Sequence, residues 1–107
     1  MQVIYNVTVS VDIHVSDEWL TWMKEVHIPD VMKTGIFLES KISRVLAEEE
    51  GGVTWAIQYL CPNMEAYERY QSEFASTLQA DHTRLYGKHT AAFRTLLEVH
   101  QDFSHER

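Results

Sequence analysis

The chain of 107 residues contains little cysteine, proline or glycine. Cys61 is the only cysteine, so no disulfide can form within the chain, and a reducing compartment is expected. No apolar run approaches the roughly 20 residues that a membrane-spanning helix needs. The first residues, MQVIYNVTVSV, lack the basic segment and cleavage site of a signal peptide. We therefore expect a single cytoplasmic domain over residues 1–107, with a frayed tail from about residue 102.

Basic residues are also scarce, because Lys and Arg number 9 against 16 Asp and Glu, a formal net charge of -7. Proteins that bind nucleic acids usually carry a basic face that displaces counterions from the phosphates. An anionic membrane surface would repel this chain for the same reason. Neither nucleic acid nor membrane is therefore expected as a partner.

Four segments have the pattern of β-strands. Residues 3–13 alternate, with apolar side chains at every odd position and mostly polar ones at the even positions. Residues 53–61 and 90–101 also predict strands, as do residues 37–47, whose two alternating faces are both apolar and leave the buried face undecided. The polar, glycine-rich turn at 48–52 would join two of these strands in a hairpin.

Two helices lie between the predicted strands. Ser16 is suited to cap the first, and Gly35 to end it. Pro29 has no amide proton and disfavours helical geometry in the residue before it, so we expect a kink or a restart there. The second helix is expected to run unbroken from a cap at Asn63 to a stop at Gly87.

The order strand, helix, strand, strand, helix, strand is typical of the α+β, ferredoxin-like βαββαβ fold. Two helices then cover one face of a four-stranded antiparallel sheet. The other face is too apolar for solvent, and a second copy of the chain would cover it in a two-fold homodimer. By alternation, that face is expected to carry Ile4, Asn6, Thr8, Thr54, Ala56, Gln58, Ala92, Arg94 and Leu96.

Four stretches give the chain a family resemblance: IYNVTV, EWLTWMKEVHIPDVMKTG, GGVTWAIQY and AFRTLLE. Together they resemble a family of small bacterial proteins classed as a domain of unknown function, within the dimeric α+β barrel superfamily. Antibiotic-biosynthesis monooxygenases, muconolactone isomerases, NIPSNAP-like proteins and the effector domains of some transcription regulators belong to the same superfamily. The resemblance implies a dimeric α+β barrel that packs sheet against sheet. It implies no activity and assigns no catalytic residue.

His27 is the candidate catalytic residue. It shares a helix face with Trp19, Leu20 and Met23 and should look toward the sheet. An imidazole among aromatic side chains can act as a general base or bind a ligand. The structural alternative is that His27 bonds a backbone carbonyl that Pro29 leaves without a partner.

Five further residues are candidates for ligand binding. Tyr5, Trp22, Trp55 and Tyr59 form either an aromatic pocket or simply part of the core. Arg94 would bind an anionic ligand inside the dimer or, as the plainer alternative, join an interface network.

Other chemistries have weaker support. Six histidines invite a metal reading, but none makes an i, i+4 pair and there is no Cys-x-x-Cys, so no metal is expected. No glycine-rich phosphate loop or Ser-His-Asp signature points to a cofactor or to a hydrolase. The RNA-recognition motif shares the strand order, but Trp55 and Tyr59 are expected to face the helices instead of the bare sheet.

Three functions therefore stay open. The first is a homodimer that binds a small molecule without established catalysis. The second is a cofactor-independent enzyme, monooxygenase-like or isomerase-like, with a pocket beside His27. The third is a structural or protein-interaction module. A real cavity beside His27 would favour the first two over the third.

Overall fold

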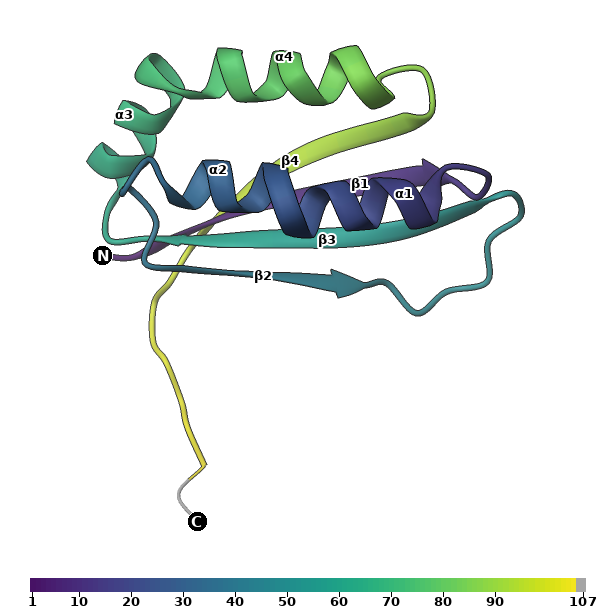
Figure 1. Ribbon diagram of the computed structural model, residues 1–107. Coiled ribbons are helices and arrows are strands. Elements are labelled where there is room, and N and C mark those ends of the chain that lie inside the picture. The colour runs from purple at the N-terminus through teal and green to yellow at the C-terminus, as the bar shows by residue number, and fades with distance from the viewer. Residues whose placement is uncertain (106–107) are drawn as a thin grey trace.

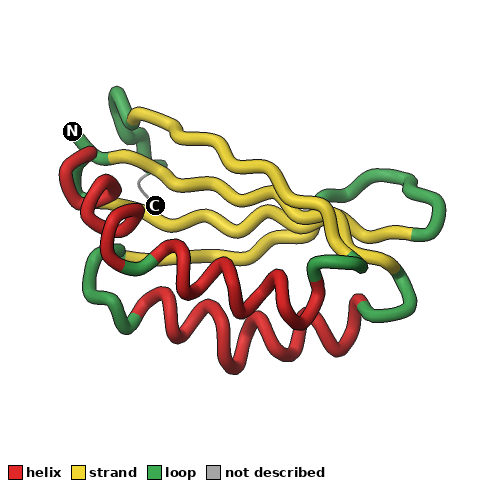
Figure 2. Tube along the Cα trace, turned by 90° about the horizontal axis from the view of Figure 1, so that it is seen from above, coloured by secondary structure: helices red, strands yellow, loops and turns green. Residues whose placement is uncertain are grey.

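The computed structural model describes residues 1–105 as an antiparallel four-stranded sheet with all its helices on one face (Figures 1 and 2). The elements are β1 (Val3–Asp12), α1 (Ser16–Trp22), η1 (Met23–His27), α2 (Ile28–Met32), β2 (Glu39–Arg44), β3 (Gly52–Cys61), α3 (Met64–Glu73), α4 (Ala75–Tyr86) and β4 (Thr90–Glu98). The strand order is β2-β3-β1-β4. The predicted α+β, ferredoxin-like fold is therefore confirmed.

The chain ends outside the sheet. Residues 102–105 of the segment predicted to fray form neither helix nor strand and are exposed, while 106–107 lie outside the described residues. None of the helices in the described part of the chain is long and apolar enough to cross a membrane.

β1 lies between β3 and β4, and its odd-numbered residues face the helices as predicted. Val3, Tyr5, Val9 and Val11 are all buried in the main core. The strand ends at Asp12, so Ile13 lies in the following turn and is exposed, contrary to its predicted place on the buried face. β1 thus supplies the floor on which the helices pack.

The predicted faces of β4 are wrong. Arg94 pairs with Val7 and Leu96 with Tyr5, and directly opposed residues of an antiparallel pair project to the same side of a sheet. Arg94 therefore faces the helices, and Phe93 takes the bare face with Asn6. The sequence pattern misleads because both faces of this edge strand are partly apolar and exposed, so hydrophobicity does not select one.

The register of β2 with β3 shows which side of β2 faces the helices, a point that the sequence leaves open. Ile42 pairs with Ile57, whose side chain is buried under the helices, so Ile42 also faces them. Lys41 pairs with Gln58 and therefore lies on the bare face. Phe37, just before the strand, is buried in the core.

The first helix passes Pro29 without breaking, because a π-helical turn accommodates the proline. The backbone N–H of Ile28 bonds to the carbonyl of Met23, and Ile28 itself stays helical at φ -63°, ψ -44°, contrary to the expected bias of this residue. The expected kink or restart takes the form of this π-turn, after which α2 begins with Pro29 in its first turn. The wider turn lets the chain continue where an α-turn would bring the proline ring against the preceding carbonyl.

The π-turn also sets which residues face the sheet. In a regular helix Trp19 and Val31, twelve positions apart, would point about 120° away from each other. The π-turn takes up one extra residue, so the two positions are separated as if by eleven residues of a regular helix. The angle between their side chains about the helix axis is then about 20°. Both side chains are buried in the same core. His27, within the turn, is brought to the same inner side.

The second helical segment is broken, contrary to the prediction of one continuous helix. Phe74, at φ -127° and ψ -34°, interrupts the ladder between α3 and α4, and Figure 1 shows the two helices meeting at an angle. The cap is as predicted, because the side chain of Asn63 accepts a hydrogen bond from the N–H of Ala66 at 2.8 Å. After the break, residues of α4 and of β4 line the same pocket, which is described below.

Candidate functional site

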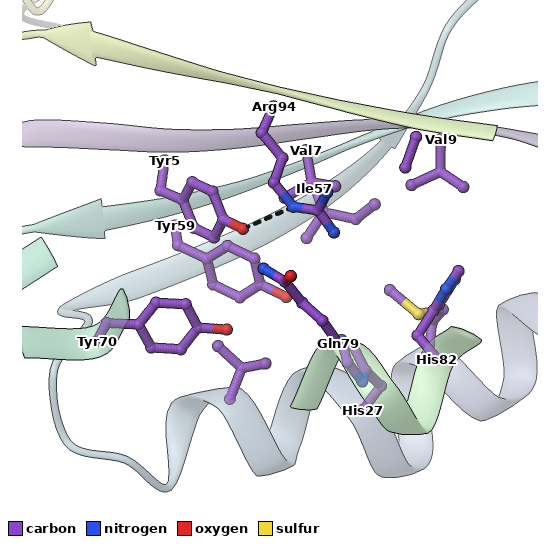
Figure 3. A pocket seen from close by; sticks show the side chains of 13 residues that line it. Tyr5, Val7, Val9, His27, Ile57, Tyr59, Tyr70, Gln79, His82 and Arg94 are labelled. Carbon is purple, nitrogen blue, oxygen red and sulfur yellow. Dashed lines mark hydrogen bonds between the residues drawn. The ribbon is translucent and has the colours of Figure 1, made fainter. Parts of the chain in front are cut away.

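A pocket lies between the helices and the sheet, with a cavity of about 40 Å³ (Figure 3). Strands β1, β3 and β4 form its floor, and η1, α2, α3 and α4 form its roof. Its apolar wall consists of Val7, Val9, Met23, Val31, Ile57 and Ala92. Its polar wall consists of Tyr5, His27, Tyr59, Tyr70, Gln79, His82 and Arg94.

Arg94 is the only charged side chain in the lining. Its Nε donates a hydrogen bond of 3.0 Å to the hydroxyl of Tyr5, which holds the guanidinium over the pocket (Figure 3). Among residues 1–105, no carboxylate lies within ion-pair distance of Arg94. The pocket therefore contains one fixed positive charge that the described protein does not neutralise.

Two buried tyrosines point their hydroxyls into the same hollow. Tyr59 and Tyr70 are each 3% exposed, and their side chains converge toward Gln79 in Figure 3. The hydrogen bonds of the described chain engage the hydroxyls of other tyrosines but not of these two. Burial raises the pKa of both phenols, so both stay protonated and able to donate.

His27 lines the pocket from the π-turn. Its ring stacks on Trp22, with centroids 5.0 Å apart, and lies 5.9 Å from the ring of His82. As the residue at the N-terminal cap of α2, His27 makes no side-chain capping hydrogen bond. Burial, reinforced by His82, lowers the pKa of His27 to about 4, and the ring is neutral at pH 7.

His82 is held by a tryptophan. The indole Nε1 of Trp19 donates a hydrogen bond of 3.0 Å to the Nε2 of His82. Because Nε2 accepts, the proton of the neutral ring must sit on Nδ1. Burial, together with the charge of Arg94, lowers the pKa of His82, which keeps the ring in this neutral form.

The structure brings together four of the six candidate residues. His27, Tyr5, Tyr59 and Arg94 all line the pocket, and Arg94 does so from the side opposite to its prediction. The other two are not in the lining.

Trp22 and Trp55 flank the pocket instead. Trp22 packs against His27, and Trp55 packs against Trp19 at 6.2 Å between ring centroids. The N–H of Trp55 is buried without a hydrogen-bond partner among the described residues. These two tryptophans support the wall of the site.

Sequence reasoning missed three lining residues: Tyr70, Gln79 and His82. Tyr70 is the buried residue of α3. Gln79 and His82 follow the buried Ala75 at four and seven positions, which places them on the same face of α4. This spacing could have predicted that Gln79 and His82 face the sheet. The prediction of one continuous helix missed the break at Phe74, after which this spacing begins.

The lining offers hydrogen-bond donors, two neutral imidazoles and one cation, without a carboxylate or a thiol. Cys61 is fully buried outside the pocket, and burial raises the pKa of its thiol to about 11. In the described part of the chain, no group of three or more His, Cys, Asp or Glu side chains is arranged to hold a metal ion. The arrangement is suited to binding an electron-rich group or to moving a proton at an imidazole.

Comparison with known protein families gives one match over nearly the whole chain. The family model described as "Domain of unknown function (DUF4286)" matches residues 2–100. No curated protein matches this chain in sequence.

Solved structures share the fold at low sequence identity. HapK from Hahella chejuensis is 11% identical, with a TM-score of 0.69 over 99% of this chain and 100% of its own. A dimeric ferredoxin-like protein from an uncultured marine organism is 11% identical, with a TM-score of 0.67 over 96% and 100%. An N63A mutant of SnoaB, a cofactor-independent oxygenase from Streptomyces nogalater, is 9% identical, with a TM-score of 0.68 over 96% and 98%.

Proposed function

The chain belongs to the DUF4286 family of domains of unknown function, and we propose that it is a homodimer whose protomers each bind a small molecule between helices and sheet. The observation that carries this proposal is the pocket itself. The hydroxyls of Tyr59 and Tyr70 make no hydrogen bond within the described chain and face one hollow beside Arg94, from which they are accessible. Each hydroxyl can therefore donate a hydrogen bond to a molecule in the pocket, beside the free cation of Arg94.

The homodimer is supported by the bare face of the sheet. Over the middle of β1, β3 and β4 this face carries twelve uncharged residues, and the charged side chains of Glu39 and Lys41 lie at its β2 edge. They are Ile4, Asn6, Thr8, Ser10, Thr54, Ala56, Gln58, Leu60, Ala91, Phe93, Thr95 and Leu97. Phe93 is 63% exposed and Leu97 43%.

The uncharged, partly apolar centre of this face favours an interface, because burying that centre requires no desolvation of ions. A second copy presents the same uncharged centre, so a two-fold arrangement is self-complementary. The dimeric ferredoxin-like protein of the same fold gives a precedent for such an assembly.

Native mass spectrometry on protein purified without added ligand tests both parts of the proposal. We expect a dimer that carries a discrete extra mass, and that mass identifies the bound molecule. A dimer without extra mass, which also stays empty after incubation with a cell metabolite extract, would contradict small-molecule binding. A monomer at micromolar concentration would contradict the homodimer.

The second candidate function is a cofactor-independent enzyme, and the neutral ring of His27 in the pocket favours it. A neutral imidazole can accept a proton, but a base with a pKa of about 4 holds that proton weakly at pH 7. Binding without catalysis therefore ranks first.

The enzyme is tested with the molecule that native mass spectrometry identifies. Supplied in excess in air, that molecule should be converted in amounts beyond the protein present, and His27→Phe should abolish the conversion. A molecule that returns unchanged would exclude catalysis of that molecule.

A further inference from the structure

The polar groups that face the pocket indicate the chemical class of its ligand. Arg94 has donors only, and Nε is already used by Tyr5, so its terminal nitrogens remain for a ligand. Arg94 belongs to an exposed edge strand, so its charge can be reached from solvent. A planar guanidinium with free terminal nitrogens is matched by a carboxylate, which accepts two parallel hydrogen bonds from it.

The tyrosines extend the same preference deeper into the pocket. Tyr59 and Tyr70 are more than nine-tenths buried, and their hydroxyls point toward the hollow below Arg94 (Figure 3). Each can donate one hydrogen bond, and burial keeps each protonated. The described chain supplies neither hydroxyl with an acceptor, and both are accessible from the pocket, so both are free to donate to a ligand.

The rest of the lining disfavours a cationic ligand and favours an aliphatic stem. No carboxylate lines the pocket, so a cationic ligand would meet Arg94 without compensation. The remaining floor is aliphatic, with Val7, Val9 and Ile57 beside the polar groups. The cavity volume of about 40 Å³ favours a small group on a short stem.

We propose that the pocket binds a small aliphatic monocarboxylate. Its carboxylate accepts hydrogen bonds from Arg94, Tyr59 and Tyr70, and its stem lies against Val7 and Ile57. This inference rests on the proposed small-molecule function and names the class of molecule. In a chain with a net charge of -7, anion binding would then depend on this one cation and not on the general field of the protein.

Nuclear magnetic resonance titration with butyrate and with butyramide, its uncharged analogue, tests the proposal at constant ionic strength. We expect butyrate to shift the Nε–H signal of Arg94 in a saturable way. Butyramide should bind at least about tenfold more weakly, a difference of about 1.4 kcal/mol in binding free energy. Arg94→Gln should reduce butyrate binding to the level of butyramide. Tyr59→Phe and Tyr70→Phe, which keep the rings, should each weaken it several-fold.

Lys41→Gln is the matched control, because it removes the same charge from the opposite face of the sheet. It should leave butyrate binding unchanged. Equal binding of butyrate and butyramide would overturn the carboxylate assignment while small-molecule binding stands. Equal losses in Lys41→Gln and Arg94→Gln would also overturn it, because binding would then follow net charge. Binding of neither probe overturns it too, and the proposed function is then judged by native mass spectrometry alone.

Discussion

The buried His27 predicts how the stability of the protein depends on pH. Its pKa falls from 6.5 to about 4, first because of burial and then because of His82, although Asp30 and Asp81 act in the opposite direction. Above pH 6.5 the ring is neutral in both the folded and the unfolded chain, and it costs nothing. As the pH falls below 6.5, the unfolded chain takes up a proton that the folded chain refuses, so stability is lost until about pH 4.

The size of this loss follows from the two pKa values. With 6.5 unfolded and about 4 folded, the free energy of unfolding should fall by about 2 kcal/mol between about pH 7.5 and about pH 5 from this residue alone. Other groups titrate over the same range, so a difference between variants isolates it. His27→Phe keeps a ring against Trp22 but cannot take up a proton.

Urea unfolding at several pH values, followed by circular dichroism, measures the effect. The stability of His27→Phe relative to wild type should rise by about 2 kcal/mol as the pH falls over that range. His14→Gln, a change at an exposed histidine, should follow the wild type. Parallel curves for the wild type and His27→Phe would refute the reasoning, because they would mean that His27 takes up protons equally in both states.

Three further predictions concern the rest of the chain. Phe93→Glu places a charge at the centre of the bare sheet face and should give monomers in sedimentation velocity at micromolar concentration. The control Leu46→Glu, at a loop residue that is 92% exposed, should leave dimers. Dimers in both variants would contradict the interface. Asn63→Ala removes the cap of α3 and should lower the free energy of unfolding by about 1 kcal/mol in urea, whereas an unchanged midpoint would mean that the cap contributes nothing. Cys61 should react with a thiol reagent only as fast as the protein unfolds, because it is fully buried and its pKa is about 11; rapid labelling of folded protein would contradict this.

Much of the fold was predictable because local signals agreed with the global arrangement. The strict alternation of β1 reflects one face against the core and one face without helices. Asn63 and Gly35 mark helix boundaries by chemistry that needs no tertiary contact: a side-chain acceptor in one case, and a positive φ of 77° in the other. Such features can be read from a single sequence.

The site was less predictable because its residues depend on tertiary pairing. The face of Arg94 is set by its register with Val7, and nothing in the composition of an edge strand exposed on both faces encodes that register. Phe74 breaks a segment that has neither glycine nor proline near the break. The sequence does not show this break, so it does not predict that His82 meets Trp19 or that α4 lines the pocket.

The π-turn of the first helix has a consequence for changes in chain length. One residue between Trp19 and Val31 is surplus to a regular helix, and Pro29 is the residue that makes a regular helix unfavourable there. Deleting Pro29 would remove both the surplus residue and the ring, and both buried side chains would stay on one face. Deleting a residue of α1 instead would leave the proline and turn the preceding part of the helix by about 100°. Among natural or engineered shortenings of this helix, loss of Pro29 is therefore the one that the core should accept.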